Sequence, residues 1–351
     1  MKFAHETPAQ RAVFAPGEAV RTVVDEVARL GSGRVLIIGG PSARVLTTEL
    51  AERLTGARVH DEVVEHVPVE AAERARAVAH EHVADALVCV GGGSATGLAK
   101  AVALAAKLPI VAVPTTYAGS EATNVWGLTR DGVKTTGVDA AVLPAIVVYD
   151  ASLLLTLPGA LAVASGLNAL AHCVDAMWGP RADPIDRAMA QEAARALSAG
   201  LPEVGAHPDR LAGHEQMLYG AYLAAVVFAS AGSGLHHKIC HVLGGRFDLP
   251  HAQTHAAVLP HVLALNAPHA PEAERRIAAA LDAPTATEGL AALYARLDVP
   301  TSLKELGMPE SGIAEAVAPV LVAVPEGNPA PVTRDRLSAL LRAAWEGDIP
   351  R

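Results

Sequence analysis

The chain has 351 residues, of which 51% are hydrophobic and 19% are charged. This composition excludes a disordered chain and supplies enough apolar material for about two domains. A formal net charge of −9 disfavours nonspecific attraction to nucleic acid or to an anionic membrane, although it is compatible with a local cationic pocket. We therefore expect neither a nucleic-acid partner nor a membrane partner.

The sequence offers no targeting or membrane-spanning segment. Residues 1–10 contain no apolar run of the kind that a secretory signal needs, and the apolar stretch 223–229 is far shorter than the roughly 20 residues that cross a bilayer. Cys89, Cys173 and Cys240 are widely spaced in apolar segments, which predicts reduced core residues. These features favour a cytoplasmic protein.

Short apolar runs recur through the first half of the chain, as in strands that are buried on both faces of a sheet. The runs are 35–38, 86–90, 110–113 and 145–148. Stretches with helical spacing, 42–54 and 69–83, lie between them. This β-α-β alternation predicts a parallel sheet with helical connections.

A hairpin is predicted within this half. Two β-type runs, 124–129 and 133–136, flank the sequence Arg130-Asp131-Gly132, and Asp-Gly is typical of a tight hairpin turn. We expect the hairpin to project from the sheet.

After Asp150 the strand signals almost vanish, and helices rich in Ala and Leu are predicted instead. Pro158 and Pro184 fit first helical turns, and Asp183 and Thr333 fit as helix caps. The predicted fold is an α/β N-terminal parallel-sheet nucleotide-binding domain, residues 1–155, followed by an all-α C-terminal domain, residues 156–351. We expect the active site in the cleft between the two domains.

Two polar loops follow consecutive predicted strands. Gly91-Gly92-Gly93-Ser94 precedes a predicted helix, so its backbone can approach a pyrophosphate whose charge the helix N-terminus stabilises. The next strand ends in residues 114–123, which carry five hydroxyl side chains suited to phosphate, ribose or amide groups. Together the loops predict a dinucleotide site.

Histidines cluster in the second half. Asn168 and His172 are four residues apart, as are His237 and His241, so each pair shares one helical face. His251 follows shortly afterwards. Imidazoles from separate segments suit either a transition-metal site or a proton-transfer site. Asn168 is a neutral and weak ligand, and this disfavours the metal.

These segments together resemble the iron-containing alcohol dehydrogenase family over about residues 10 to 345. The matching stretches are Gly91–Lys100, Val113–Glu121, Gly166–His172 and His237–His251. General members of that family usually carry Asp where Gly97 and Asn168 stand. Both departures match a branch of the family that reduces a carbon–carbon double bond.

The resemblance implies an NADH- or NADPH-dependent oxidoreductase that acts on a small unsaturated oxo-dicarboxylate in aromatic-compound degradation. It further implies a homodimer. No acidic residue follows the first predicted strand, where Gly39 and Gly40 stand, so the sequence leaves the choice between NADH and NADPH open.

The residues expected at the site fall into three groups. The catalytic residues are His172, His237, His241 and His251, of which His241 falls on the family's position beside the nicotinamide. The cofactor-binding residues are Gly40, Gly91, Gly92, Gly93, Ser94, Thr115, Thr116, Ser120 and Lys134. The substrate-binding residues are Tyr117, Asn168, Lys238 and Arg246, of which the last two would face the substrate carboxylates.

By resemblance, His172, His237 and His251 fall on the positions that hold iron or zinc in the wider family. With Asn168 in place of a carboxylate, we favour a metal-free role for these histidines as donors to substrate oxygens. Three alternatives stay open. They are a metal-dependent alcohol or aldehyde dehydrogenase, a dehydroquinate-synthase-like lyase that retains its NAD, and a nucleotide-binding protein without catalysis.

Overall fold

The structure, a computed structural model, describes residues 2–130 and 133–350. The chain divides into two compact units. One unit comprises Pro8–Leu157, and the other comprises Met1–Thr7 together with Pro158–Arg351.

The first unit is built on a six-stranded sheet in which every neighbouring pair is parallel. In order across the sheet, the strands are β1 (Arg11–Phe14), β8 (Ile146–Tyr149), β5 (Ile110–Pro114), β4 (Ala86–Gly91), β2 (Val35–Ile38) and β3 (Arg58–His60). The four strands predicted from apolar runs are confirmed as the fully buried central strands. The sequence did not predict the two edge strands, whose residues are partly exposed.

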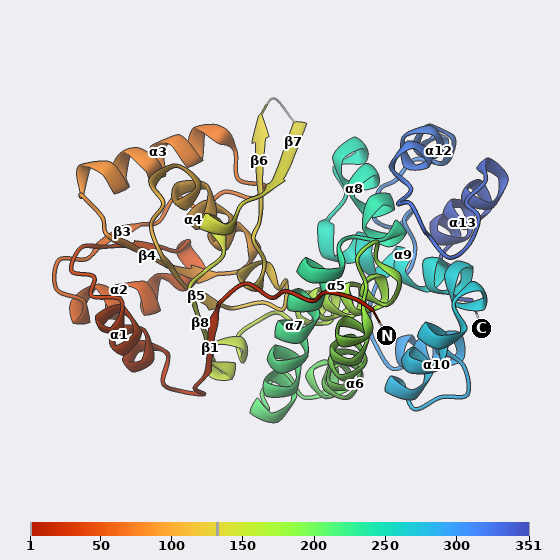
Figure 1. The fold of residues 1–351 in the computed structure, drawn as a ribbon, viewed down its shortest axis with the longest axis horizontal. Coiled ribbons are helices and arrows are strands. Elements are labelled where there is room, and N and C mark those ends of the chain that lie inside the picture. Colours follow the sequence, from red (N-terminus) through yellow and green to blue (C-terminus); the bar gives the residue numbers. More distant parts are fainter. Residues whose placement is uncertain (1, 131–132, 351) are drawn as a thin grey trace. The chain divides into compact units, whose positions relative to one another are not determined.

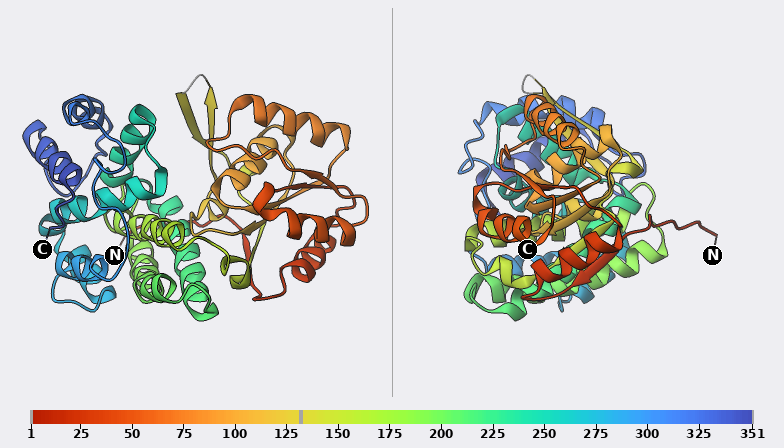
Figure 2. Two further views of the ribbon diagram at one scale, coloured as in Figure 1. Left: turned by 180° about the vertical axis from the view of Figure 1, so that it is seen from behind. Right: turned by 90° about the vertical axis from the view of Figure 1, so that its left-hand side faces the viewer.

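Helices cover both faces of this sheet (Figures 1 and 2). The helices α1 (Ala19–Arg29) and α2 (Arg44–Arg53) pack together on one face, and α3 (Val69–Glu81) and α4 (Gly93–Ala106) pack together on the other. Val23 and Leu50 bring the first pair into a core with alternate residues of the central strands. The predicted parallel α/β unit is thus confirmed.

The predicted hairpin is formed by β6 (Val125–Arg130) and β7 (Val133–Val138), which pair antiparallel. The Asp131-Gly132 turn lies outside the described residues. Within the hairpin, the Thr129 hydroxyl of β6 donates to the carbonyl of His66 at 2.7 Å, which ties β6 to the segment before α3. Short 3₁₀ helices occur in the described residues at Pro41–Ala43, Ser120–Ala122, Ala140–Val142, Ala151–Leu154 and Ala267–His269.

The second unit is helical, and its described residues contain no strand after Tyr149. Its helices are α5 (Gly159–Trp178), α6 (Pro184–Ala206), α7 (Leu211–Ala231), α8 (Leu235–Phe247), α9 (His251–Asn266), α10 (Pro271–Ala280), α11 (Ala286–Tyr294), α12 (Ser311–Ala323) and α13 (Arg334–Glu346). The predicted caps are confirmed, since Asp183 accepts N–H bonds at the start of α6 and Thr333 does so at the start of α13.

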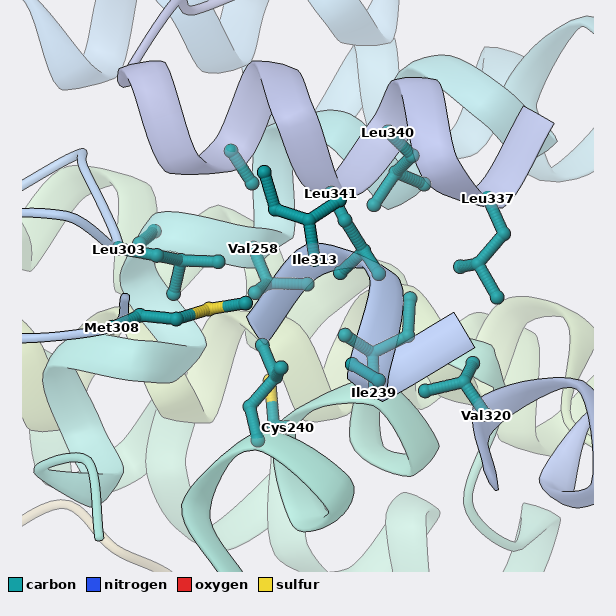
Figure 3. Packing of buried hydrophobic residues seen from close by; sticks show 14 of the residues in the cluster. Ile239, Cys240, Val258, Leu303, Met308, Ile313, Val320, Leu337, Leu340 and Leu341 are labelled. Carbon is teal, nitrogen blue, oxygen red and sulfur yellow. The ribbon is translucent and has the colours of Figure 1, made fainter. Parts of the chain in front are cut away.

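An apolar core joins α8, α9, α12 and α13 (Figure 3). Ile239 and Cys240 of α8 meet Val258 of α9 and the leucines of α13 there. The three cysteines are buried and unbridged, as predicted. This packing fixes α8 and α9, the two helices that carry most of the histidines, against a rigid support.

Helix α5 is apolar along its length, and most of it is buried inside the protein. It is the one single helix of the described residues that is long and apolar enough to cross a membrane, and α7 with α8 would pass the same test as a pair bent by 97°. Such burial is what the central helix of a packed bundle shows.

Candidate active site

The glycine loop forms the open start of helix α4. Gly91 has a φ of 143°, which a side chain would strain, and Gly92 is the N-cap without a side-chain hydrogen bond. A Cβ on Gly93 would meet nothing nearer than Ala118 at 3.9 Å, so space remains above the first turn. The N–H groups and the positive end of α4 therefore suit a pyrophosphate.

The hydroxyl-rich loop follows β5, the next strand of the sheet. Thr116 lies against the glycine loop, since a Cβ on Gly92 would come within 3.0 Å of its methyl carbon. Thr115 and Ser120 are partly exposed, whereas Tyr117 is fully buried and burial raises the pKa of its hydroxyl far above the usual range. The threonines and Ser120 therefore lie where a ligand at the strand ends would reach them.

A buried ionic network holds this loop. The Lys100 ammonium donates to the Thr123 carbonyl at 2.8 Å, to its hydroxyl at 3.1 Å and to the Val125 carbonyl at 2.8 Å. Burial lowers the pKa of Lys100 to about 7, and the neighbouring Glu121 opposes that shift. The Tyr149 hydroxyl donates to Glu121 at 3.0 Å. These contacts fix both ends of the segment that follows β5.

A cavity of about 630 Å³ opens at the carboxyl ends of the strands of the same unit. It is lined by Val90 of β4, by Thr115 just after β5, by Ser42 in the turn after β2, and by Asp150 and Ser152 after β8. Gly40 is the N-cap of the turn Pro41–Ala43 at this edge. The size and the position of this cavity suit part of a dinucleotide.

Lys134 was expected to contact the cofactor. Its backbone pairs with Thr129 in the hairpin, but its side chain lies outside the described residues.

In the helical unit, α5, α8 and α9 pack against one another (Figure 1), and they carry the histidines. His172 and His237 are buried and stack with ring centroids 4.9 Å apart, and Phe228 of α7 packs on both rings. The Nδ1 of His237 bonds to the Asp175 carboxylate at 2.7 Å, while its Nε2 is buried without a partner.

His241 and His251 stand at the exposed side of this cluster. The His241 ring lies 6.1 Å from that of His237, and the His251 ring lies 4.4 Å from that of His255. The cluster therefore has two exposed imidazoles, whereas His172 and His237 are buried.

A further pair of histidines, His236 and His255, is also buried in this cluster. His236 Nε2 and His255 Nδ1 are 2.9 Å apart, and the Cys240 thiol lies 3.7 Å from the same His236 nitrogen. The His255 ring is 4.8 Å from that of His237. Neither His236 nor His255 was predicted as a site residue.

Burial controls the protonation of these rings. It lowers the pKa of His172 to about 4 and that of His236 to about 3, and it lowers the pKa of His237 and His255 well below the usual value. Each ring also lowers the pKa of its neighbours when it is charged. Burial therefore favours the neutral form of these four imidazoles.

The remaining predicted substrate residues lie in different surroundings. Asn168 is buried on α5, and its Oδ1 has no hydrogen-bond partner. Lys238 is partly exposed next to His237 on α8. Arg246 is exposed at the end of α8, where its guanidinium pairs with Glu315 at 3.3 Å.

The resemblance implies an iron or zinc ion, which needs several ligand atoms close to one another. Among the described residues, the three-member groups whose ligand atoms lie within 4.8 Å of one another are His236 with His237 and His255, and His5 with Asp183 and Asp186. Neither contains His172 or His251, and the amide of Asn168 is a weak ligand. In the described part of the chain, the ligand atoms of His172 and His251 thus join no such close group, and this gives no geometric support to the family's iron or zinc site.

Asp175 was missed by sequence reasoning because its partner is 62 residues away. His255 had a usable signal, since it follows His251 by four residues and so shares its helical face.

Comparison with known proteins covers both units. The description "Iron-containing alcohol dehydrogenase" matches residues 9–151, and "Fe-containing alcohol dehydrogenase family, C-terminal" matches residues 162–345. A maleylacetate reductase from Sphingobium indicum is 46% identical over 100% of this chain and 99% of its own length.

Two solved structures share the fold throughout. An iron-containing alcohol dehydrogenase from Corynebacterium glutamicum has a TM-score of 0.97 and 56% identity over 99% of this chain and 98% of its own. A maleylacetate reductase from Agrobacterium tumefaciens has a TM-score of 0.94 and 39% identity, with 100% of each chain covered.

Proposed function

The chain belongs to the iron-containing alcohol dehydrogenase family and is an oxidoreductase that reduces maleylacetate, and we propose how its residues share this reaction. In the overall change, 2-maleylacetate, a reduced nicotinamide and one proton give 3-oxoadipate and the oxidised nicotinamide. The product retains both carboxylates and the ketone. This is the step expected in the degradation of aromatic compounds.

The observation that carries this function is the set of groups around Asn168. Metal-dependent members of the family usually carry a carboxylate where Asn168 stands, whereas this chain offers an amide, which is a weaker ligand for a divalent ion. Histidines without a metal suit a reaction in which an oxyanion forms and a proton is returned.

The first unit has the groups to hold NADH or NADPH. The Gly91–Ser94 loop and the N-terminus of α4 would meet the pyrophosphate, and Gly40, Thr115, Thr116, Ser120 and Lys134 would contact the rest. The bound nicotinamide supplies the hydride that the alkene carbon β to the ketone receives.

Hydride addition leaves an enolate, with its negative charge on the ketone oxygen. We assign His172 and His237 to this oxygen because their rings stack in a site where burial strengthens each hydrogen bond. The Asp175 carboxylate balances the positive charge that His237 carries when its Nε2 donates. His251 would add a further donor from the exposed side.

The enolate then takes a proton on the carbon next to the ketone. His241 is assigned as the acid because it is exposed, so solvent can reprotonate it after each turnover.

The two substrate carboxylates need polar partners. Lys238 is the preferred cation since it is partly exposed beside His237, whereas Glu315 already engages Arg246. The Asn168 amide completes the proposed substrate contacts, whereas Tyr117, also expected to bind substrate, is fully buried and is assigned no contact.

The finer properties of the enzyme are also proposals. The β2 end bears Gly39 and Gly40 rather than an acid, which supports use of both NADH and NADPH. We further propose a cytoplasmic homodimer. For the nucleotide-binding domain predicted at 1–155 and the catalytic domain predicted at 156–351, we propose the unit Pro8–Leu157 and the unit of Met1–Thr7 with Pro158–Arg351, respectively.

The decisive experiment follows the absorbance of NADH with freshly prepared maleylacetate, with and without a chelator. Turnover that resists the chelator and yields 3-oxoadipate supports the assignment. Turnover of aldehydes alone, lost on chelation, would instead identify a metal-dependent alcohol dehydrogenase. Product formation without net NADH consumption would identify a lyase.

A further inference from the structure

We propose that Asp175 is a positioning residue for the reduction, and that it holds the ring of His237 in one orientation and one tautomer. This inference rests on the proposed role of His237 at the ketone oxygen. It concerns a residue of α5 that lies three positions after His172, on the same helix.

The contacts of Asp175 are concentrated on one oxygen. Its Oδ2 accepts from the Gly234 N–H at 3.0 Å, from the His237 N–H at 3.2 Å and from His237 Nδ1 at 2.7 Å. Its Oδ1 is buried without a partner. One carboxylate therefore binds the start of helix α8 and the side chain of a histidine in its first turn.

The backbone is adapted to this close approach. Gly234 is the N-cap of α8, and a Cβ on it would come within 2.4 Å of Asp175 Oδ1. A helix usually takes its cap from the N-cap side chain itself. Here a carboxylate from another helix replaces that cap, and the glycine leaves room for it. The Asp175 carboxylate therefore both caps α8 and binds the side chain of His237.

The consequence for His237 is chemical. A carboxylate at Nδ1 keeps a proton on that nitrogen, so Nε2 is the nitrogen that takes up a second proton and then donates to a substrate oxygen. The stacked rings of His172 and Phe228 prevent the imidazole from rotating away. A carboxylate that only capped α8 would not need the bond to Nδ1 or the rings packed on His237.

The first test is Asp175→Asn. The amide oxygen can still accept all three N–H bonds while its NH₂ replaces the unpartnered Oδ1, so α8 keeps its cap and only the charge is lost. The expected result is a fall in kcat with maleylacetate of about 10²-fold, with the KM for NADH changed less than about threefold.

The second test is Gly234→Ala, which retains Asp175 and His237 but forces them apart. Its matched control is Gly245→Ala, since nothing lies within 4 Å of a Cβ at that position of the same helix. We expect the first variant to lose kcat as Asp175→Asn does, and the control to keep it.

A further control separates capping from positioning. Asp183 caps α6 of the same unit through the N–H groups of Ile185 and Asp186, but it contacts none of the cluster histidines. Asp183→Asn should leave kcat unchanged. Equal losses of kcat in Asp175→Asn and Asp183→Asn would reduce Asp175 to a structural cap and overturn the proposal.

The last readout does not depend on turnover. The ¹⁵N shifts of His237 should show the Nδ1–H tautomer in the unaltered protein and lose that preference in Asp175→Leu, with the fold checked by circular dichroism. An Nε2–H tautomer in the unaltered protein would overturn the proposal. If the unaltered protein shows the Nδ1–H tautomer but does not reduce maleylacetate, the proposed function fails and the positioning role stands.

Discussion

The buried ammonium of Lys100 lies 2.8 Å from the carbonyl oxygen of Thr123. Lys100 belongs to the helix that begins at the glycine loop, and Thr123 ends the hydroxyl-rich loop of the next strand. One side chain thus couples the two loops that are proposed to share the cofactor. Tight coupling of this kind preorganises a binding site before its ligand arrives.

Replacing Lys100 with Met tests that coupling. The substitution leaves the carbonyls of Thr123 and Val125 without their donor, at a cost of about 1 to 3 kcal/mol each when they stay buried. We expect a lower Tm and a KM for NADH raised about tenfold, while kcat changes little. Steady-state kinetics and thermal unfolding measure both effects. The matched control is Lys107→Met at the exposed end of the same helix, which should change neither.

His241→Gln tests the assigned acid. Because His241 is exposed, the substitution should leave folding intact but lower kcat about 10²- to 10⁴-fold. Fluorescence titration of NADH and single-turnover kinetics distinguish binding from chemistry. The exposed His269→Gln serves as the control. Unchanged kcat in His241→Gln would transfer the proton-donating role to another residue.

Asn168→Asp tests whether a single amide prevents metal binding. A carboxylate there would restore the ligand type that most of the family carries, and we expect the variant to bind more Zn²⁺ or Fe²⁺ than the unaltered chain. Reduction of maleylacetate should fall as metal is added, because the ion would occupy histidines needed for the oxyanion. Metal content measured by mass spectrometry, with and without chelator, checks this. Equal metal content in both proteins would refute it.

Stability should depend on pH through buried neutral histidines. Burial lowers the pKa of His261, on α9, from 6.5 to about 4, so between these values the unfolded chain binds a proton that the folded chain does not. Stability is therefore complete above pH 6.5 and falls as the pH drops towards 4. The slope is at most about 1.4 kcal/mol per pH unit for each such histidine. His261→Gln should flatten the profile in denaturant titrations, and an identical slope would contradict the argument.

Sequence patterns predicted the elements whose residues are uniform in environment. The runs at 35–38 and 86–90 are buried on both faces, so each residue reports the same burial. The strands Arg11–Phe14 and Arg58–His60 were not predicted. Both are short edge strands with exposed residues, and they are too short to show a run or an alternation of apolar residues. Capping residues were predictable because their hydrogen bonds are local.

The site was only partly predictable for a related reason. Motifs located the glycine loop and four of the histidines, which act within short segments. The pairing of Asp175 with His237 and of Lys100 with Thr123 depends on tertiary packing between elements. An isolated Asp in an apolar helix or Lys in a small-residue helix gives no sequence signal of its partner.

The division of the chain has a consequence for modular exchange. Residues Met1–Thr7 group with Pro158–Arg351, and His5 bonds to Asp183 at 2.8 Å within that unit. In sequence, the nucleotide-binding unit is therefore an insertion into the helical one. A chimera that borrows a different cofactor unit needs two junctions, near Thr7 and near Leu157. A single cut would remove the tether that His5 provides.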